Sequence, residues 1–243
     1  MGVSFLTMNA GKRSMTLNLK SLAGRDVFLR LVDTGDVVLE NFRPGTMARL
    51  GLGADVLRAR NPRLSYCAVS GFGQTGPLSG RASYDQIVQG FYGLMSPTGS
   101  AETAPLRAGY VVCDTTAALT AAFAVVAALF RRGQTGEGAE LDVAMLDSAL
   151  ASMASWPVAN WLNTGTAPQP LGNESHTAAP SETFANADAP LNIVNNEQRI
   201  NRRRSGTPSG RDNNTLTYIE EIRSGWGPGR RRSGPQHTAY FIN

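Results

Sequence analysis

The chain contains few of the side chains that most often bind metals or form disulfides. Its 243 residues include two cysteines, Cys67 and Cys113, and two histidines, His176 and His237. None of them has the spacing of a metal-binding motif, so we predict no metal site and no disulfide framework. We expect both thiols to be reduced and buried. No histidine lies near the predicted core, so a histidine-based catalytic triad is not supported.

Long apolar segments and nucleotide fingerprints are missing as well. The most apolar run, residues 117–130, is shorter than a membrane span and contains Thr120, so we expect a buried helix and no membrane insertion. Residues 1–10 lack the pattern of a secretory leader, which favours a cytoplasmic location. The glycine-rich loop 71–77 matches neither the P-loop nor the dinucleotide fingerprint. It is either a flexible turn or a place where the backbone approaches a ligand.

The net charge of +4 is unevenly distributed. Residues 1–198 carry 14 Lys and Arg against 16 Asp and Glu, whereas residues 199–243 carry 9 Arg against 3 acids. The basic character therefore belongs to the C-terminal segment and is weak support for nucleic-acid binding by the rest. Nucleic-acid binding by the Arg-rich tail is an alternative, but the tail lacks the alternation of aromatic and basic residues found in known modules.

Strand and helix patterns alternate along the first two thirds of the chain. We predict strands at residues 15–19, 36–40 and 64–70, and a strand or extended run at residues 109–113. Residues 140–142 lead into a further helix. We predict helices at residues 22–32, 46–58, 84–95, 115–132 and 143–156, the fourth closed by Gly133. Such alternation is typical of an α/β fold with a parallel sheet and flanking helices.

The composition changes after residue 162. Residues 163–190 are rich in Thr, Ala, Pro and Asn, as loops and linkers are. Residues 199–243 lack apolar periodicity. We therefore predict a core over residues 1–162, a linker and the start of a second domain over residues 163–198, and an irregular Arg-rich tail over residues 199–243.

The segment ENFRPGTMARLG, Glu40–Gly51, follows an apolar run that predicts a buried parallel strand. Ligands of open α/β sheets bind beyond the carboxyl ends of the strands. The segment carries an amide, Asn41, an aromatic ring, Phe42, and the guanidiniums of Arg43 and Arg49. This combination suits an anionic ligand with a flat base, such as a nucleotide or coenzyme A.

Asp114 stands at the predicted junction of a strand and the Ala-rich helix. One interpretation is a helix N-cap, because Asp accepts hydrogen bonds from the free N–H groups of the first turn. The alternative is a nucleophilic carboxylate at the floor of a cleft. The two roles are compatible.

Five blocks in fixed order carry a resemblance to a known family. They are NAGKRSMTLNLKS, DVVLENFRPGTMARLGLG, NPRLSYCAVSGFGQTGP, SYDQIVQGFYGLM and CDTTAALTAAFAVVAALFRRGQTGEGAELDVAMLDS. Over roughly residues 4–198 the chain resembles the family III CoA-transferases, the group of formyl-CoA transferase and carnitine CoA-transferase. The resemblance implies the incomplete large domain of such an enzyme, with a parallel Rossmann-like sheet and flanking helices.

The resemblance also implies an activity and a site. Asp114 matches the family's nucleophilic aspartate, which transfers coenzyme A from an acyl-CoA to a carboxylic acid through covalent aspartyl intermediates. Tyr84 and Asp85 are expected near the reacting centre. CoA and acyl-CoA act as substrates, without a permanently bound cofactor, and the family forms homodimers. The expected CoA-binding residues are Leu17, Asn18, Leu19, Lys20, Asn41, Phe42 and Arg49.

Two alternatives stand beside this activity. The same superfamily contains α-methylacyl-CoA racemases, whose catalytic histidine falls where this chain has Tyr84, so a two-base racemase is disfavoured. The chain also differs from the family in length, because it begins late and the second domain is missing after about residue 198. The second alternative is therefore an inactive remnant that binds CoA or assembles with a partner without turnover.

Overall fold

The computed structural model describes residues 2–175, 181–184, 191–195, 217–221 and 240–242. The chain divides into two compact units. Unit 1 comprises Met1–Tyr92 and Gly109–Ala159, and unit 2 comprises Gly93–Ala108 and Asn160–Asn243. Residues 93–108, which we predicted within the core, therefore group with unit 2. The predicted boundaries at residues 162 and 198 stay predictions.

Unit 1 is built around a three-stranded sheet in the order β1-β2-β3. These strands are β1 (Val37–Glu40), β2 (Ser65–Ser70) and β3 (Glu140–Ala144). Both strand pairs run parallel, with Cys67 of β2 beside Leu39 on one side and Leu141 on the other. The predicted parallel α/β sheet is confirmed. The strand predicted at residues 15–19 is wrong, because these residues form no regular element. The strand or extended run predicted at residues 109–113 is not a strand, and residues 112–113 already belong to a helix.

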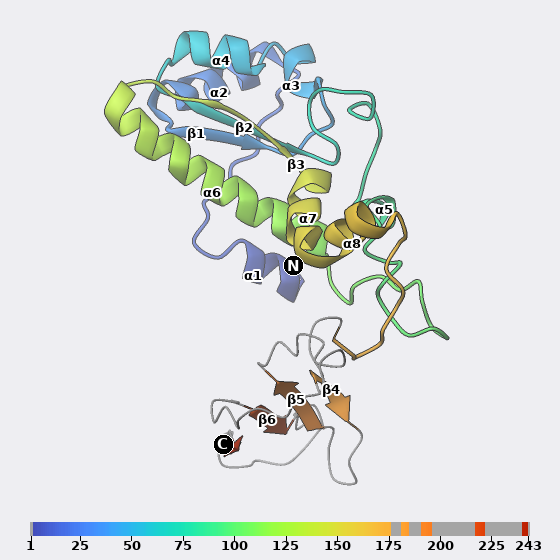
Figure 1. The fold of residues 1–243 in the computed structure, drawn as a ribbon. Helices are drawn as coiled ribbons and strands as arrows, with labels where there is room; N and C mark the ends of the chain where they lie inside the picture. The colour runs from blue at the N-terminus through green and yellow to red at the C-terminus, as the bar shows by residue number, and fades with distance from the viewer. Residues whose placement is uncertain (1, 176–180, 185–190, 196–216, 222–239, 243) are drawn as a thin grey trace. The chain divides into compact units, whose positions relative to one another are not determined.

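Helices cover both faces of this sheet (Figure 1). One face carries α2 (Leu22–Thr34), α3 (Thr46–Arg49) and α4 (Ala54–Arg60), and the other carries α5 (Asp85–Phe91), α6 (Val112–Thr135) and α7 (Met145–Met153). The central strand β2 is buried on both sides, since Tyr66 and Ala68 pack toward the first group and Cys67 toward the second. Alternate residues of a strand point to opposite faces, which is why an almost wholly apolar run is needed here.

Several predicted helices end elsewhere than expected. The single helix predicted over residues 46–58 is divided into α3 and α4, because Gly51 adopts a left-handed φ of 70°. This break turns Leu52 into the core, where it is 1% exposed. The helix predicted over residues 84–95 is shorter in the structure, where α5 covers only Asp85–Phe91. The predicted helix 143–156 becomes α7, a π-helical turn Ala154–Val158 that contains Pro157, and α8 (Ala159–Thr164).

Helix α6 extends beyond the predicted range at both ends. It continues through Gly133 and stops at Gly136, whose left-handed φ of 80° closes the helix. The N-cap residue is Val111, so the prediction that Asp114 is the N-cap is wrong. Asp114 lies inside the first turn instead. A cap supplied from another element, described below, explains why local sequence misplaced this end.

The two faces of α6 differ in side-chain size. Small residues, among them Ala117, Ala121 and Ala128, are buried against the sheet. The opposite face exposes an apolar stripe of Leu119, Phe123, Val126 and Phe130, each at least 65% exposed. Our expectation of a buried helix is therefore correct for one face only. The 24-residue helix is also long and apolar enough to cross a membrane, a test that core helices of soluble proteins pass as well.

Unit 2 contains a second sheet, in which neighbouring strands run antiparallel in the order β4-β5-β6-β7. The strands are β4 (Ser181–Phe184), β5 (Leu191–Asn195), β6 (Thr217–Glu221) and β7 (Tyr240–Ile242). Two of them lie in the tail that we predicted to be irregular, and the rest of residues 199–243 lies outside the described residues. In unit 1 a short helix, α1 (Val3–Met8), precedes the sheet elements.

Candidate active site

A cavity of about 270 Å³ lies at the carboxyl ends of the strands of unit 1. Its walls come from the loops after β1 and β2, the segment before α5, and the first residues of α6 and α7. The lining residues are Asn41, Phe42, Arg43, Pro44, Ser70, Gly71, Arg81, Ala82, Ser83, Tyr84, Asp114 and Met145. This is the edge of a parallel α/β sheet where ligands generally bind.

Hydrogen bonds at the end of β1 hold the ENFRP turn against the cavity. The buried carboxylate of Glu40 accepts a hydrogen bond from the Phe42 N–H at 2.6 Å and another from the Tyr66 hydroxyl at 3.2 Å. Asn41 donates from Nδ2 to the Val69 carbonyl at 2.7 Å, which joins the ends of β1 and β2. The Phe42 ring stays 47% exposed and is free to contact a ligand.

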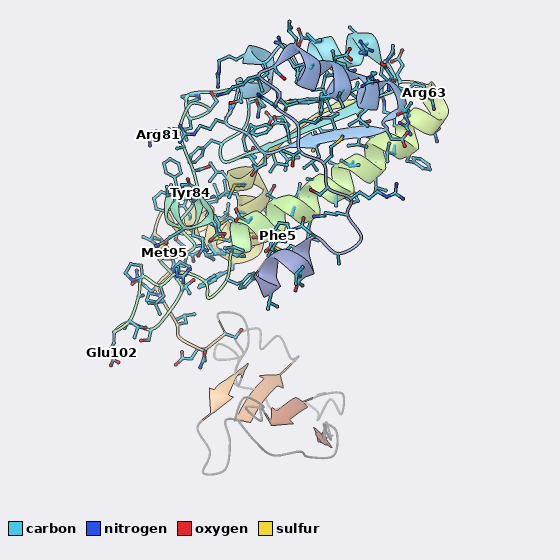
Figure 2. The ribbon with its side chains drawn as sticks, turned by 180° about the vertical axis from the view of Figure 1, so that it is seen from behind. Phe5, Arg63, Arg81, Tyr84, Met95 and Glu102 are labelled. Atoms are coloured by element: carbon cyan, nitrogen blue, oxygen red, sulfur yellow. The ribbon has the colours of Figure 1, made fainter. Side chains whose placement is uncertain are left out.

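The positive charge in the cavity wall comes from Arg43 and Arg81. Figure 2 shows Arg81 and Tyr84 at the same side of unit 1. Arg49, which we predicted in the CoA site, does not line this cavity. Its guanidinium donates to Thr46 Oγ1 at 2.9 Å and lies over Gly45.

The segment Leu17–Lys20, also predicted to bind CoA, lies outside the cavity and forms a turn ahead of α2. The Asn18 carbonyl accepts from the Ser21 N–H at 3.0 Å, and Asn18 Oδ1 accepts from the Lys20 N–H at 3.1 Å. Gly24 packs so tightly against the Asn18 carbonyl that a Cβ at this position would clash with it. The turn is therefore held rigidly at the start of α2.

Asp85 supplies the helix cap that we had assigned to Asp114. Its side chain is 6% exposed, and its Oδ1 accepts from the Cys113 N–H at 2.7 Å and from the Asp114 N–H at 3.3 Å. Its Oδ2 accepts a hydrogen bond from Gln89. The free N–H groups of the first turn of α6 are thus satisfied by a carboxylate from α5. This contact fixes the backbone of Asp114 at the cavity.

The Asp114 carboxylate itself is left available. It lines the cavity, and within the described part of the chain it forms no hydrogen bond or ion pair. Desolvation and the negative charge of Asp85 raise the pKa of Asp114 above its ordinary value. A carboxylate with a raised pKa is a stronger base and a stronger nucleophile than an ordinary one. The arrangement therefore suits attack on an electrophilic carbonyl.

The cysteines and Tyr84 are less suited to that role. Cys113 is fully buried, and desolvation together with the Asp85 charge raises its pKa to about 11, so its thiol is protonated at neutral pH. Burial raises the pKa of Cys67 in the same direction. Tyr84 lies at the rim and is 73% exposed. Among the described residues no group of three or more metal-binding side chains occurs.

Several lining residues escaped the sequence-based prediction. Ser70 is the last residue of β2, Arg81 and Ser83 lie just before α5, and Met145 opens α7. The signal for Ser70 was present, because the predicted strand 64–70 ends there and ligands bind beyond such ends. Signals for two of the others were present as well, because Ser83 directly precedes the predicted Tyr84 and Met145 directly follows β3.

Comparison with known proteins identifies the family. The sequence matches the model of CoA-transferase family III over residues 1–207. It is 41% identical over 195 residues to succinate–glutarate CoA-transferase of Agrobacterium fabrum, an alignment that covers 80% of this chain and 48% of the relative. It is 42% identical over 190 residues to acetyl-CoA:oxalate CoA-transferase of Acetobacter aceti, with 78% and 49% covered.

The fold comparison agrees. The crystal structure of a CAIB/BAIF family protein from Brucella suis superposes with a TM-score of 0.71 at 37% identity, covering 77% of this chain and 50% of that one. The chain spans about half the length of the curated relatives it matches. With its matching family model, its homologous relatives and its shared α/β fold, the chain belongs to CoA-transferase family III.

Proposed function

We propose that the chain takes part in transferring coenzyme A from an acyl-CoA to a carboxylic acid, with Asp114 as the covalent nucleophile. The observation that carries this proposal is the Asp114 carboxylate, which has a raised pKa, lines a cavity at the carboxyl edge of the sheet, and is not paired with any other described residue. Family membership supplies the reaction class.

In the proposed mechanism, the Asp114 carboxylate attacks the carbonyl carbon of the donor thioester. The C–S bond breaks and leaves a mixed anhydride and a CoA thiolate. The thiolate then attacks the aspartyl carbon, so that an aspartyl-CoA thioester forms and the donor acid leaves as a carboxylate. An acceptor carboxylate repeats these steps in reverse, which regenerates Asp114. No net proton is consumed, and the thioester energy is retained.

The residues that line the cavity also support a proposal for how CoA and the acid bind. The Phe42 ring and the Asn41 turn form one wall for CoA, and Leu17, Asn18, Leu19, Lys20 and Arg49 remain proposed CoA contacts from the family resemblance. Arg43 and Arg81 suit a carboxylate, because guanidinium groups bind carboxylates by paired hydrogen bonds. Since the relatives are named for glutarate and oxalate, we infer a small dicarboxylic acid as the acceptor.

The finer points of the family resemblance belong to the same proposal. We propose a homodimer in the cytoplasm, related in mechanism to the formyl-CoA transferase and carnitine CoA-transferase group. Tyr84 at the rim and Asp85 beneath α6 are the proposed neighbours of the reacting atoms. Tyr84 stands in place of the histidine of the racemases, so transfer is favoured over racemisation.

Chemical trapping tests the nucleophile. The protein is incubated with an acyl-CoA, quenched with hydroxylamine or borohydride, and its peptides are analysed by mass spectrometry. We expect a modification at Asp114 that disappears in Asp114→Asn. Asp147→Asn is the matched control, because Asp147 is also an exposed residue in the first turn of a helix but does not line the cavity. A folded wild-type protein without an Asp114 adduct would contradict covalent catalysis.

The second candidate function is binding without turnover, which the exposed Phe42 ring at the cavity favours. It predicts that CoA raises the melting temperature of the wild type and that no adduct forms. Arg49→Ala and Phe42→Ala should then reduce the CoA-induced shift, whereas a surface change such as Arg30→Ala should not.

A further inference from the structure

Glu40 is a buried carboxylate that the proposed mechanism does not use. It ends β1 and is 9% exposed, and it lies on the same face of the strand as Val38, which packs toward α2, α3 and α4. In the described part of the chain no lysine or arginine forms an ion pair with it. Burying a charge without a counter-charge is costly, so this carboxylate calls for an explanation.

Two neutral donors meet the carboxylate. The Phe42 N–H donates to Oε2 at 2.6 Å, and the Tyr66 hydroxyl donates to Oε1 at 3.2 Å. Burial and the Glu40 charge raise the pKa of Tyr66, so its hydroxyl is protonated at neutral pH and serves as the donor. Since Tyr66 belongs to β2, the carboxylate ties the main chain at Phe42 to the central strand of the sheet.

The residue held in this way belongs to the wall of the cavity. Phe42 lines the cavity that contains Asp114, and its ring is 47% exposed. A second tie acts one residue earlier, where Asn41 donates to the Val69 carbonyl of the same central strand. Two consecutive residues of the turn are therefore fixed to β2, and the Phe42 ring is held in place before any ligand binds.

We propose that Glu40 is a positioning residue for coenzyme binding, which acts through the backbone of Phe42 and does not touch the ligand. This inference rests on the proposed function, in which the Phe42 ring contacts CoA. A group that is ordered in advance loses less conformational freedom when the ligand binds. Glu40 should therefore affect the affinity for CoA and leave the reaction of Asp114 with a bound thioester unchanged.

Calorimetric titration with free CoA measures this effect without any reaction. Glu40→Leu removes both hydrogen bonds and should weaken CoA binding about tenfold, the loss typical of one hydrogen bond to a charged group. Glu40→Gln should keep nearly the wild-type affinity. Its amide oxygen can accept from the Phe42 N–H, and its amide nitrogen can donate to the Tyr66 oxygen.

Asp142→Leu is the matched control. The Asp142 carboxylate also accepts a hydrogen bond from a loop N–H, that of Gln74 at 2.8 Å, but neither residue lines the cavity. This change should leave the affinity for CoA as it is. If Glu40→Leu does not fold, Tyr66→Phe carries the test, because it removes only the hydroxyl that anchors the carboxylate. It should weaken CoA binding about threefold.

A double-mutant cycle with Phe42→Ala separates positioning from general destabilisation. If Glu40 acts through Phe42, Glu40→Leu should add less than about twofold to the loss of affinity that Phe42→Ala already causes. A merely structural role would multiply the two losses, and that result overturns the inference. The rate of Asp114 adduct formation at saturating acyl-CoA should stay within about twofold of the wild-type rate, because only binding is affected.

The same measurements distinguish this inference from the proposed chemistry. CoA affinity that depends on Glu40, without any Asp114 adduct, refutes the covalent mechanism and retains the positioning role. An Asp114 adduct together with equal CoA affinities of the wild type and Glu40→Leu refutes the positioning role and retains the mechanism. A folded wild-type chain that binds no CoA overturns both.

Discussion

Two carboxylates at the start of α6 have different roles because their hydrogen bonds differ. Asp85 is buried and accepts hydrogen bonds from two backbone N–H groups of the helix, whereas Asp114 faces the cavity. The charge of Asp85 contributes to the raised pKa of Asp114. One residue is therefore a structural cap that tunes the other, and the two functions can be separated by substitution.

Asp85→Asn should lower the pKa of Asp114 while keeping α6 in place. The amide oxygen can still accept from Cys113, but the negative charge is lost. Since Asp114 reacts as a carboxylate, the acidic limb of the adduct-formation rate against pH should move to lower pH. A limb that does not move would show that the charge of Asp85 has no part in tuning Asp114.

Asp85→Ala is the companion variant, and it should lose about 1 kcal/mol of unfolding free energy as a cap is removed.

Stability in acid provides a further check on Asp114. A raised pKa means that the folded state favours the protonated form. Protonated Asp114 therefore adds to the free energy of unfolding at pH values below its ordinary pKa of 3.8, and this contribution is lost as the pH rises through the raised pKa. Asp114→Asn should abolish that loss, as measured by thermal unfolding between acid and neutral pH.

Among the elements, those with strong local patterns were predictable and their ends were not. The apolar runs of β1 and β2 and the Ala-rich centre of α6 identify themselves. The ends depend on distant partners. Asp85, 28 residues before Cys113, caps α6, so the sequence around Asp114 predicted the wrong start. Gly133 was a reasonable stop signal, yet Gly136 provides it.

Two glycines near the end of α6 test how far this region depends on contacts with residues distant in sequence. Gly133 lies in the helix with open space around its Cα, so Gly133→Ala should stabilise the protein by about 0.5–1 kcal/mol. A Cβ on Gly138 would clash with the Leu64 carbonyl, so Gly138→Ala should destabilise it by about 1–3 kcal/mol. Denaturant unfolding measures both. Equal effects of the two changes would contradict the packing of residues 136–139 beside β2.

At the scale of the whole molecule, the location of the site was predictable from the sequence, but the full set of residues that line it was not. The carboxyl edge of a parallel sheet is a general binding position, and of the predicted site residues Asn41, Phe42 and Asp114 line the cavity there. Arg49 was expected beside them, but its hydrogen bond to Thr46 directs the guanidinium elsewhere. Arg81 joins the cavity through tertiary folding, which spacing along a sequence does not encode.

The apolar stripe on α6 should affect how the molecules behave in concentrated solution. Contiguous exposed apolar surface of this kind favours association. Replacing Phe123 and Phe130 by Gln should reduce concentration-dependent self-association in sedimentation velocity and leave the melting temperature nearly unchanged, because both rings are more than 70% exposed. Ala121→Gln, on the buried face, is the contrasting change and should destabilise the fold. Unchanged sedimentation of the double variant would show that the stripe does not drive association.

The tight contact between Gly71 and Ser83 determines how the cavity could change in evolution or in the laboratory. A Cβ on Gly71 would overlap the Ser83 side chain, so residue 71 cannot vary until residue 83 becomes smaller. Altered acid selectivity should therefore be reached in a fixed mutational order, first at Ser83 and only afterwards at Gly71. A library that randomises both positions should yield folded Gly71 variants almost exclusively in combination with Ser83→Gly, because alanine at position 83 keeps the Cβ that overlaps.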